Sequence, residues 1–534
     1  MRGVGCKCVK AGLILAGFPF GLALGVAARA QMTTSQYDNA RTGAYLNERT
    51  LTPKNVNPQQ FGKLFTMKVD GDVYAQPLFL TGVEVPGKGR HDLVFIATEH
   101  DSVYAFDAYG NPSAPLWQVS FLKDGATPVS SGEAGCPFIE PEVGITSTPV
   151  IDTRSGTLYV LARTKQYHLL SHTEFHQELH ALAVTNGVEK FGGPVEIEAS
   201  VQGRGTGSVG GIVAFHPLRE NPRAALLLAN GMVYLSWGSS CDVGPYHGWV
   251  MAYDAGSLKQ EAVFNTSPDA DDSGIWAGDT GPAADKDGNV FVATGNGRFD
   301  AGKGGRDYGD SLLKLRFEGG NLKPEDYFAP YNVDELDAND DDLGSSGPML
   351  LPDQPGAHPH LAIVGGKAPV MYVLDRDHLG HYHADRDSDV VQTIRTLGGI
   401  YGSMAYWNHH VYVLSDGDAL RDYEVKDGQL TFKAASSFRF EDHAATPAIS
   451  ANGDRDGIVW VVSSKSWNSP GRTTVLHATE ASNVAHELYN TNQNATRDRA
   501  GRALRFNIPT IVNGHVYVGA RGEVDVYGLL AVRR

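Results

Sequence analysis

The chain has 534 residues, of which 42% are hydrophobic and 20% are charged, and its formal net charge is −16 at pH 7. An acidic surface repels nucleic acids and anionic membranes, so we expect neither as a partner. No stretch beyond residue 30 has the length and apolarity of a membrane span.

Residues 1–30 have the pattern of an export signal. Three basic residues precede the apolar stretch 11–26, and Ala28-Arg29-Ala30 is a small-residue cleavage pattern. We therefore expect the mature chain to begin near Gln31 and to be periplasmic or secreted. The polar residues 31–60 follow, and we expect them to lie extended across the folded domain.

A short sequence pattern typical of consecutive strands then recurs eight times. Each unit opens at a turn that usually contains proline, and it continues through a Gly or Asn turn into a strand rich in Val, Tyr and Phe. The units recur at intervals of roughly 40 to 70 residues, the length of a four-stranded propeller blade with its loops. The strands concerned are Asp92–Thr98, Gly156–Ala162, Gly231–Trp237, Gly288–Thr294, His360–Gly366, His410–Ser415, Gly457–Ser463 and Gly514–Ala520.

These repeats predict an all-β fold, a β-propeller with eight blades of four-stranded antiparallel sheets, in a single domain over residues 61–534. Blades packed face to face around an axis bury both faces of each sheet. The eighth unit, from Phe506 onward, has only three strands, and we expect the N-terminal segment Phe61–Val69 to complete this last blade and close the ring. Seven blades is the alternative, because the unit around Ala405 is short and lacks the opening proline.

Two cysteines, Cys136 and Cys241, follow the predicted signal. In an exported protein an even pair favours a disulfide, and two free buried thiols are the alternative. No Cys-x-x-Cys-His sequence occurs, so the chain carries no c-type haem of its own. Any electrons that it gained would have to leave to a separate acceptor.

Four short segments from different units carry chemically informative residues. The first two are Ser239–Asp254 (SSCDVGPYHGWVMAYD), with an acidic residue before a strand ending in Tyr-Asp, and Val290–Gly297 (VFVATGNG), a strand followed by Gly-Asn-Gly. The others are the acidic Asp340–Ser345 (DDDLGS) and Lys367–Arg376 (KAPVMYVLDR), a basic residue before a strand ending in Leu-Asp-Arg.

With the repeats, these segments resemble the quinoprotein dehydrogenases, eight-bladed propellers that hold pyrroloquinoline quinone (PQQ) and calcium on the axis. The resemblance implies that Asp242 and Asn296 give oxygen ligands to calcium, which accepts carboxylate and neutral carbonyl oxygens. It implies that Asp342 is the catalytic base beside the metal, with Asp340 as a close rival. It also implies that Lys367 has the role of the family's basic residue, which hydrogen-bonds a quinone oxygen.

The chain also departs from the family. Where the family pairs two adjacent cysteines against the cofactor, this chain has Cys136 alone; a bridge to Cys241 would put a long-range disulfide beside Asp242 instead. The stacking tryptophan is absent from its aligned place, and Trp276 is the nearest candidate. Cys136, Cys241, Trp276 and Lys367 are therefore the candidate cofactor-binding residues.

Each segment also has an interpretation without function. Gly295-Asn296-Gly297 is a natural tight turn, because Asn and Gly tolerate positive φ. Residues 340–342 are typical of an acidic loop, and Lys367 is typical of a solvated side chain. Their joint occurrence in successive units is what favours a cofactor pocket.

Two functional hypotheses follow. In the first, the protein is an exported PQQ- and calcium-dependent dehydrogenase that oxidises a small alcohol or sugar: the cation polarises the quinone, Lys367 steadies the charge on its oxygen and Asp342 removes the alcohol proton. In the second, it is a non-catalytic PQQ-like repeat propeller that binds a protein or glycan as a scaffold. The missing tryptophan and second cysteine favour the second hypothesis.

Overall fold

The computed structural model describes residues 1, 3–5, 30–168, 172–440, 446–465, 467–469 and 471–531. The predicted export signal lies outside the described residues, apart from residues 1, 3–5 and 30. Among the described residues, no helix is both long and apolar enough to cross a membrane.

Eight antiparallel sheets form eight blades of a closed propeller, which confirms the predicted fold class and excludes seven blades. We number the blades 1–8 from the sheet that contains β4. The innermost strands are β4 (Leu78–Val85), β9 (Val150–Asp152), β15 (Leu227–Ala229), β19 (Ala283–Ala284), β23 (Met349–Leu350), β27 (Ala405–Trp407), β31 (Ala448–Asn452) and β35 (Thr510–Val512). The second strands are β5 (Gly89–Ala97), β10 (Thr157–Tyr167), β16 (Met232–Trp237), β20 (Val290–Ala293), β24 (Leu361–Gly365), β28 (His410–Val413), β32 (Arg455–Ser463) and β36 (His515–Ala520).

The second strands overlap the eight Val- and aromatic-rich runs of the sequence, and they are buried because both faces of each blade pack against a neighbour. The third strands are β6 (Ser102–Asp107), β11 (Thr173–Ala183), β17 (Trp249–Asp254), β21 (Leu312–Glu318), β25 (Val370–Asp375), β29 (Ala419–Lys426), β33 (Val475–Glu480) and β37 (Glu523–Leu529). The outer strands are β7 (Trp117–Ser120), β12 (Val195–Glu196), β18 (Gln260–Asn265), β22 (Asn321–Phe328), β26 (Gln392–Arg395), β30 (Gln429–Arg439), β34 (Asn483–Asn490) and β3 (Phe61–Lys68).

The ring closes as the sequence predicts. The N-terminal strand β3 pairs antiparallel with β37 and becomes the outer strand of blade 8. Phe61 of β3 then packs against blade 7, with its ring centroid 5.5 Å from that of Trp460 and 4.9 Å from that of Tyr489. The junction of the two chain ends is therefore held by both a strand ladder and an aromatic core.

Residues 31–48 form a strip at the hub of the propeller. Arg41 is fully buried there, and its guanidinium group donates hydrogen bonds to the carbonyl oxygens of Pro282, Ser35 and Leu226. The strip contacts the innermost part of every blade. The contacts, from blade 1 to blade 8, are Gln31 with Leu80, Thr33 with Ile151, Asn39 with Leu228, Asn39 with Ala284, Ala40 with Leu350, Thr42 with Tyr406, Gly43 with Ile449 and Tyr37 with Ile511.

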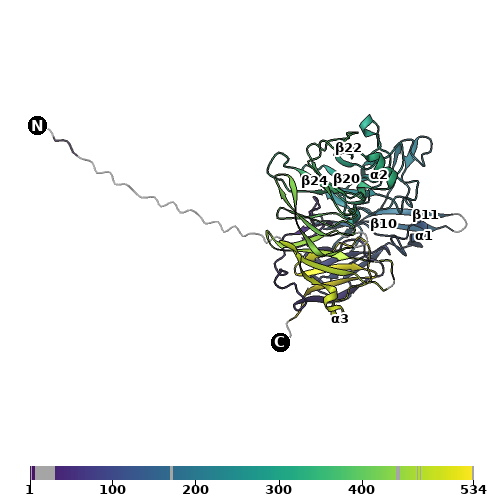
Figure 1. Cartoon of the computed structure of the whole chain (residues 1–534). Helices are drawn as coiled ribbons and strands as arrows, with labels where there is room; N and C mark the ends of the chain where they lie inside the picture. The colour runs from purple at the N-terminus through teal and green to yellow at the C-terminus, as the bar shows by residue number, and fades with distance from the viewer. Residues whose placement is uncertain are drawn as a thin grey trace.

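The remaining elements lie between or beside the blades, and β10 and β11 project from blade 2 next to α1 (Figure 1). The additional strands are β1 (Gln31–Met32), β2 (Ala44–Tyr45), β8 (Ala126–Pro128), β13 (Ser200–Gln202) and β14 (Ile212–Ala214). The helices are α1 (Ser131–Ala134), α2 (Val333–Asn339) and α3 (Ala495–Asp498), with 3-10 turns η1 (Ala277–Asp279), η2 (Ala301–Lys303), η3 (Leu343–Ser345) and η4 (Thr491–Asn494).

Candidate active site

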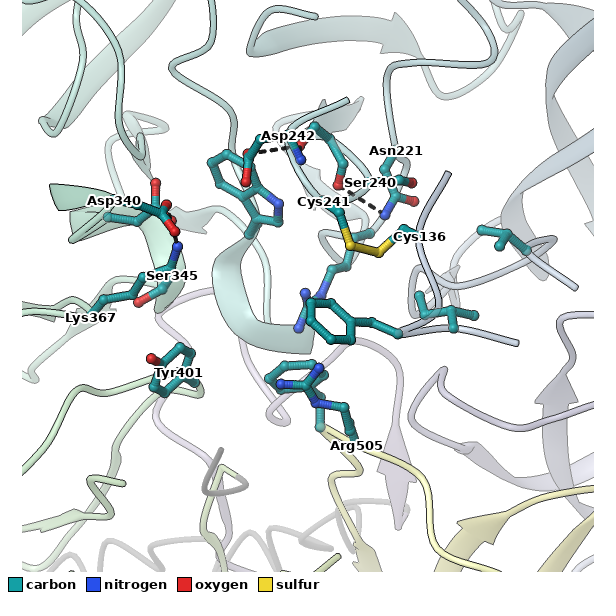
Figure 2. A pocket seen from close by; sticks show the side chains of 18 of the residues that line it. Cys136, Asn221, Ser240, Cys241, Asp242, Asp340, Ser345, Lys367, Tyr401 and Arg505 are labelled. Atoms are coloured by element: carbon teal, nitrogen blue, oxygen red, sulfur yellow. Dashed lines mark hydrogen bonds and ion pairs between the residues drawn. A yellow bond between two sulfur atoms is a disulfide. The ribbon is translucent and has the colours of Figure 1, made fainter. Parts of the chain in front are cut away.

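A pocket of about 380 Å³ opens between loops that belong to different blades (Figure 2). Six of the seven site residues predicted from the sequence line it: Cys136, Cys241, Asp242, Trp276, Asp342 and Lys367. The seventh, Asn296, is not among the lining residues, but its main chain contacts Asp342. The structure thus brings together residues that are widely separated in the chain.

Lys367 holds two carboxylates at one side of this pocket. Its Nζ lies 2.5 Å from Oδ2 of Asp342 and 2.6 Å from Oδ1 of Asp340. Asp342 precedes η3 and its side chain is 4% exposed, whereas Asp340 caps the C-terminus of α2 and its side chain is 60% exposed. Lys367 therefore matters far more to the charge of the buried Asp342 carboxylate than to that of the exposed Asp340 carboxylate.

The ionisation of this pair follows from its burial. Burial raises the pKa of Asp342 to about 6, although Lys367 and the main chain of Asn296 act to lower it. Burial alone would lower the pKa of Lys367, but Asp342 and Asp340 raise it above the usual value. Lys367 is therefore a fixed cation, and Asp342 is a buried carboxyl group with a pKa raised to about 6.

Asn296 stands directly beside Asp342. Its main-chain N–H donates a hydrogen bond of 2.6 Å to Oδ1 of Asp342, so the Gly-Asn-Gly turn after β20 positions the carboxylate. The side-chain Oδ1 of Asn296 is buried and has no hydrogen-bond partner among the described residues. A buried amide oxygen without a partner is costly unless something absent from the protein chain binds it.

Asp242 is held by its own loop between β16 and β17. Cys241 and Asp242 both adopt left-handed backbone conformations, with φ of 52° each. Oδ1 of Asp242 accepts hydrogen bonds from the hydroxyls of Ser239 at 3.1 Å and Tyr246 at 2.8 Å. Tyr246 is fully buried, so the carboxylate has a rigid support on one side.

The two cysteines form a disulfide, as the sequence predicts. Their Cα atoms are 5.4 Å apart, and the bond joins the loop after α1 to the β16–β17 loop, immediately before Asp242. Figure 2 shows this disulfide facing into the pocket. Disulfides of this kind persist in oxidising compartments.

Trp276 lies in a niche made by glycines. Its ring centroid is 6.0 Å from that of Tyr246, with the two planes at 78°. A Cβ atom at Gly295 would lie 2.5 Å from Cζ3 of Trp276 and 2.1 Å from Oδ1 of Asp342. The absence of a side chain at Gly295 is what lets the indole and the carboxylate approach each other.

Further carboxyl groups surround this region. Burial and the nearby Asp271 and Asp242 raise the pKa of Asp272 to about 7. Burial, followed by the charge of Asp342, raises the pKa of Asp310 well above its usual value. Crowded carboxyl groups resist ionisation, and here they lie next to the partnerless side-chain oxygen of Asn296. Oxygen atoms of these kinds are the ligands that a hard cation such as calcium prefers. Within the described ranges, however, no three His, Cys, Asp or Glu side chains converge closely enough to hold a metal by themselves.

Several lining residues were missed from the sequence. Tyr401, Arg223, Arg505, Phe506 and Phe138 all face the pocket. They stand in loops without periodicity, and only the folded ring places residues near 138 beside residues near 505.

Proteins of solved structure share this fold. No protein-family model matches the chain, and no curated protein matches it in sequence. Among solved structures, it is similar to quinohemoprotein alcohol dehydrogenase from Comamonas testosteroni (TM-score 0.59, 14% identity, 93% of this chain and 80% of that one). It is also similar to quinohemoprotein alcohol dehydrogenase ADHIIG from Pseudomonas putida HK5 (TM-score 0.61, 14% identity, 93% and 80%) and to a europium-containing methanol dehydrogenase (TM-score 0.57, 12% identity, 94% and 98%). The chain has the eight-bladed fold of the PQQ-dependent alcohol and methanol dehydrogenases, which confirms the resemblance that its sequence indicates.

Proposed function

We propose that the protein is an exported dehydrogenase that oxidises an alcohol with a PQQ-type quinone and a bound cation. The observation that carries this proposal is the pairing of the buried Asp342 with Lys367 in a pocket that also contains Trp276 and a disulfide. The disulfide supports export to an oxidising compartment. The fold of the solved neighbours supports the alcohol dehydrogenase chemistry.

Asp342 is the general base of the proposed reaction. Its carboxylate would accept the hydroxyl proton of the alcohol, and a quinone, when bound, would supply the two-electron oxidant for the hydride of the alcohol's C–H bond. Because the pKa of Asp342 is about 6, the group is mostly ionised at neutral pH and still basic enough to accept a proton. Asp340 is the weaker candidate because its side chain is mostly exposed to solvent.

Lys367 serves two purposes in this scheme. Its ammonium group stabilises the ionised form of Asp342, and it is placed to donate a hydrogen bond to an oxygen that gains negative charge. A lysine held by two carboxylates keeps its proton throughout, so it acts by charge and not by proton transfer.

Asp242 and Asn296 are the proposed cation ligands, with Asp342 nearby. The partnerless Oδ1 of Asn296 and the carboxylate of Asp242 fit an oxygen-loving cation. Such a cation supplies Lewis-acid polarisation of the quinone when it is bound. Calcium is the cation that the sequence suggests, and the europium-containing methanol dehydrogenase of similar fold makes europium a second ion to test.

A binding propeller without catalysis is the alternative function. It is favoured by one observation: no three acidic, His or Cys side chains converge on a metal position within the part of the chain that the structure describes. In this alternative the pocket would hold a protein or glycan segment, and the Asp340–Lys367–Asp342 cluster would be structural.

The decisive experiment titrates calcium and europium into the purified protein by calorimetry, with and without PQQ, and then follows dye reduction with alcohols and aldoses. We expect cation binding to become tighter with PQQ, and Asp342→Asn to abolish dye reduction while it retains PQQ. Asp454→Asn, at a side chain that is 80% exposed, is the matched control. Absence of both PQQ binding and dye reduction would leave the binding propeller as the function.

A further inference from the structure

The two proposed cation ligands, Asp242 and Asn296, stand on different loops. Asp242 lies between β16 and β17, and Asn296 follows β20. Calcium takes about six to eight oxygen ligands, so two side chains and a bound cofactor would leave part of its coordination shell to other groups. Further oxygen atoms of the protein are therefore expected next to these two residues.

Residues 271–273 lie between the two loops. The main-chain N–H of Asp272 donates a hydrogen bond of 3.1 Å to the carbonyl oxygen of Tyr246, in the loop that carries Asp242. The main-chain N–H of Ser273 donates one of 2.7 Å to the carbonyl oxygen of Asn296. This short segment is thus bonded to the loops of both proposed ligands.

The carboxyl group of Asp272 shares a partner with that of Asp242. The hydroxyl of Tyr246 donates a hydrogen bond of 2.8 Å to Oδ1 of Asp242, and it also contacts the side chain of Asp272. The neighbouring Asp271 is exposed, and its Oδ2 accepts a hydrogen bond from Thr206. Of the two adjacent acidic residues, Asp272 is therefore the one paired with Asp242.

Two buried oxygen atoms beside this segment have no hydrogen-bond partner among the described residues. One is Oδ1 of Asn296, and the other is Oγ of Ser273, a residue that is 0% exposed. A Cβ atom added to Gly297 would collide with that hydroxyl, so Ser273 faces the turn that carries Asn296. Burial of such oxygen atoms without a partner is costly, and a cation that bound them would remove the cost.

The backbone of the segment is held in a conformation that is strained for residues other than glycine. Asp272 and Ser273 are both left-handed, with φ of 59° and 57°. Cys241 and Asp242 have the same conformation. The two carboxyl groups that meet at Tyr246 are thus both presented from strained backbone, which is commonest at functional sites.

These oxygen atoms together have the character of a site for a hard cation. Carboxylate and neutral oxygen atoms are the ligands that calcium takes from proteins. The cluster contains only two carboxyl groups. It therefore agrees with the finding that, in the part of the chain that the structure describes, no three acidic, His or Cys side chains converge on a metal position.

We propose that Asp272 is a cation ligand, a second carboxylate beside Asp242, and that the hydroxyl of Ser273 contributes a further oxygen. This inference rests on the proposed dehydrogenase function for the identity of the cation. Binding of the cation can nevertheless be measured without turnover.

The test measures the binding of calcium and europium to the purified protein by calorimetry, with and without PQQ. Asp272→Asn is the main variant, because asparagine tolerates a left-handed backbone and the substitution removes little besides the charge. Asp271→Asn is the matched control, since it removes the same charge one residue away, at an exposed side chain. We expect Asp272→Asn to weaken binding about 10-fold to 100-fold, and Asp271→Asn to stay within about 3-fold of the wild type.

A second readout separates a ligand from a residue that only supports the loop. The luminescence lifetimes of bound europium in light and heavy water report how many water molecules the ion holds. Asp272→Gly and Ser273→Gly keep the left-handed backbone, and each should add about one water because one protein oxygen leaves the ion. Asp272→Asn retains an oxygen and should leave the water count unchanged.

The melting temperature gives a third readout. Without a cation, Asp272→Asn should melt no lower than the wild type, because it removes the repulsion between two carboxyl groups. With calcium or europium, the wild type should gain more stability than the variant. A purely structural role of Asp272 would lower the melting temperature of the variant equally in both conditions, which would contradict the proposal.

Three further outcomes would overturn the inference: equal cation affinities of Asp272→Asn and Asp271→Asn, an unchanged water count in Asp272→Gly, or no cation binding by the wild type in either condition. If Asp242→Asn weakens binding and Asp272→Asn does not, the proposed function stands without this ligand. Binding that depends on Asp272 but is accompanied by no dye reduction would keep the site and refute the dehydrogenase.

Discussion

The hydroxyl group of Tyr246 donates a hydrogen bond to Oδ1 of Asp242, and the ring of Tyr246 lies nearly perpendicular to that of Trp276. One buried tyrosine thus contacts both a proposed cation ligand and a proposed cofactor contact. Residues that hydrogen-bond a metal ligand often affect the metal affinity nearly as much as the ligand itself.

Tyr246→Phe removes that hydrogen bond and the contact of the same hydroxyl with Asp272, and it keeps the ring. We expect the affinity for calcium or europium to fall about 10-fold, because the carboxylate of Asp242 loses its orientation. Calorimetric titration checks this. Tyr412→Phe is the control, because it removes an equally buried hydroxyl whose partner is the carbonyl of Ala481 in blade 7. Equal affinities for the two variants would show that Tyr246 does not position Asp242.

Gly295→Ala should separate Trp276 from Asp342. The added methyl would lie 2.1 Å from Oδ1 of Asp342, so the carboxylate must move. We expect PQQ-dependent dye reduction to fall about 100-fold, as is usual for a displacement of about 1 Å in a catalytic group. Gly256→Ala is the control, since its new methyl meets only Oδ1 of Asp254, at 3.5 Å. A fully active Gly295→Ala variant would contradict the proposed role of Asp342.

Removal of the disulfide should destabilise the whole domain. The bond joins residues 105 positions apart, so Cys136→Ala with Cys241→Ala should lower the free energy of unfolding by about 5 kcal/mol on the chain-entropy estimate. Urea unfolding at neutral pH measures it. Dithiothreitol should destabilise the wild type to the same extent and leave the double variant unchanged; a wild type insensitive to reduction would contradict the expected contribution.

The loop that carries Cys136 has its own pH-dependent anchor. Glu133 of α1 lies 2.5 Å from Nζ of Lys165 in β10 and accepts hydrogen bonds from Ser130. Burial raises the pKa of Glu133, but Lys165 and Ser130 outweigh it and hold the pKa below the usual value. A depressed folded-state pKa stabilises the fold above the unfolded-state pKa of about 4.3, and this stability is lost as the pH falls through the folded-state value.

Glu133→Gln should therefore cost about 1 kcal/mol of unfolding free energy at pH 7, and the difference from the wild type should shrink below about pH 4. Urea unfolding across this pH range gives the comparison. Glu325→Gln, in an exposed pair with Arg316, should have no measurable effect at either pH. A difference that stays constant with pH would mean that ionisation of Glu133 is not its cause.

The sequence predicts the framework of this protein because its signals are local. The Val- and aromatic-rich runs mark the second strand of every blade, and the three-stranded last unit correctly assigns Phe61 to blade 8. Two cysteines in a chain that begins with an export-signal pattern correctly predict their pairing. The inner strands are harder to see: β19 and β23 have only two residues each, too few for any periodic pattern.

The pocket was predictable only in part, for a related reason. Asp342 and Lys367 stand in segments that resemble a known pattern, but the importance of Tyr246 and Arg505 comes from contacts across blades. Such contacts depend on how the loops fold over the ring, and nothing in the sequence near residue 505 specifies Phe138 as its neighbour. The polar composition of residues 31–60 suggests a segment extended across the domain, but it does not show that residues 31–48 contact the inner part of every blade.

The strip at the hub has a consequence for how the molecule assembles. Residues 31–48 leave the ribosome before any blade is complete, yet Tyr37 finds its partner at Ile511, near the other end of the chain. Contacts over such sequence distances form slowly, because a long loop must close before they give any stability. The strip can therefore complete its contacts only after blade 8 has formed, and we expect closure of the ring to come late in folding.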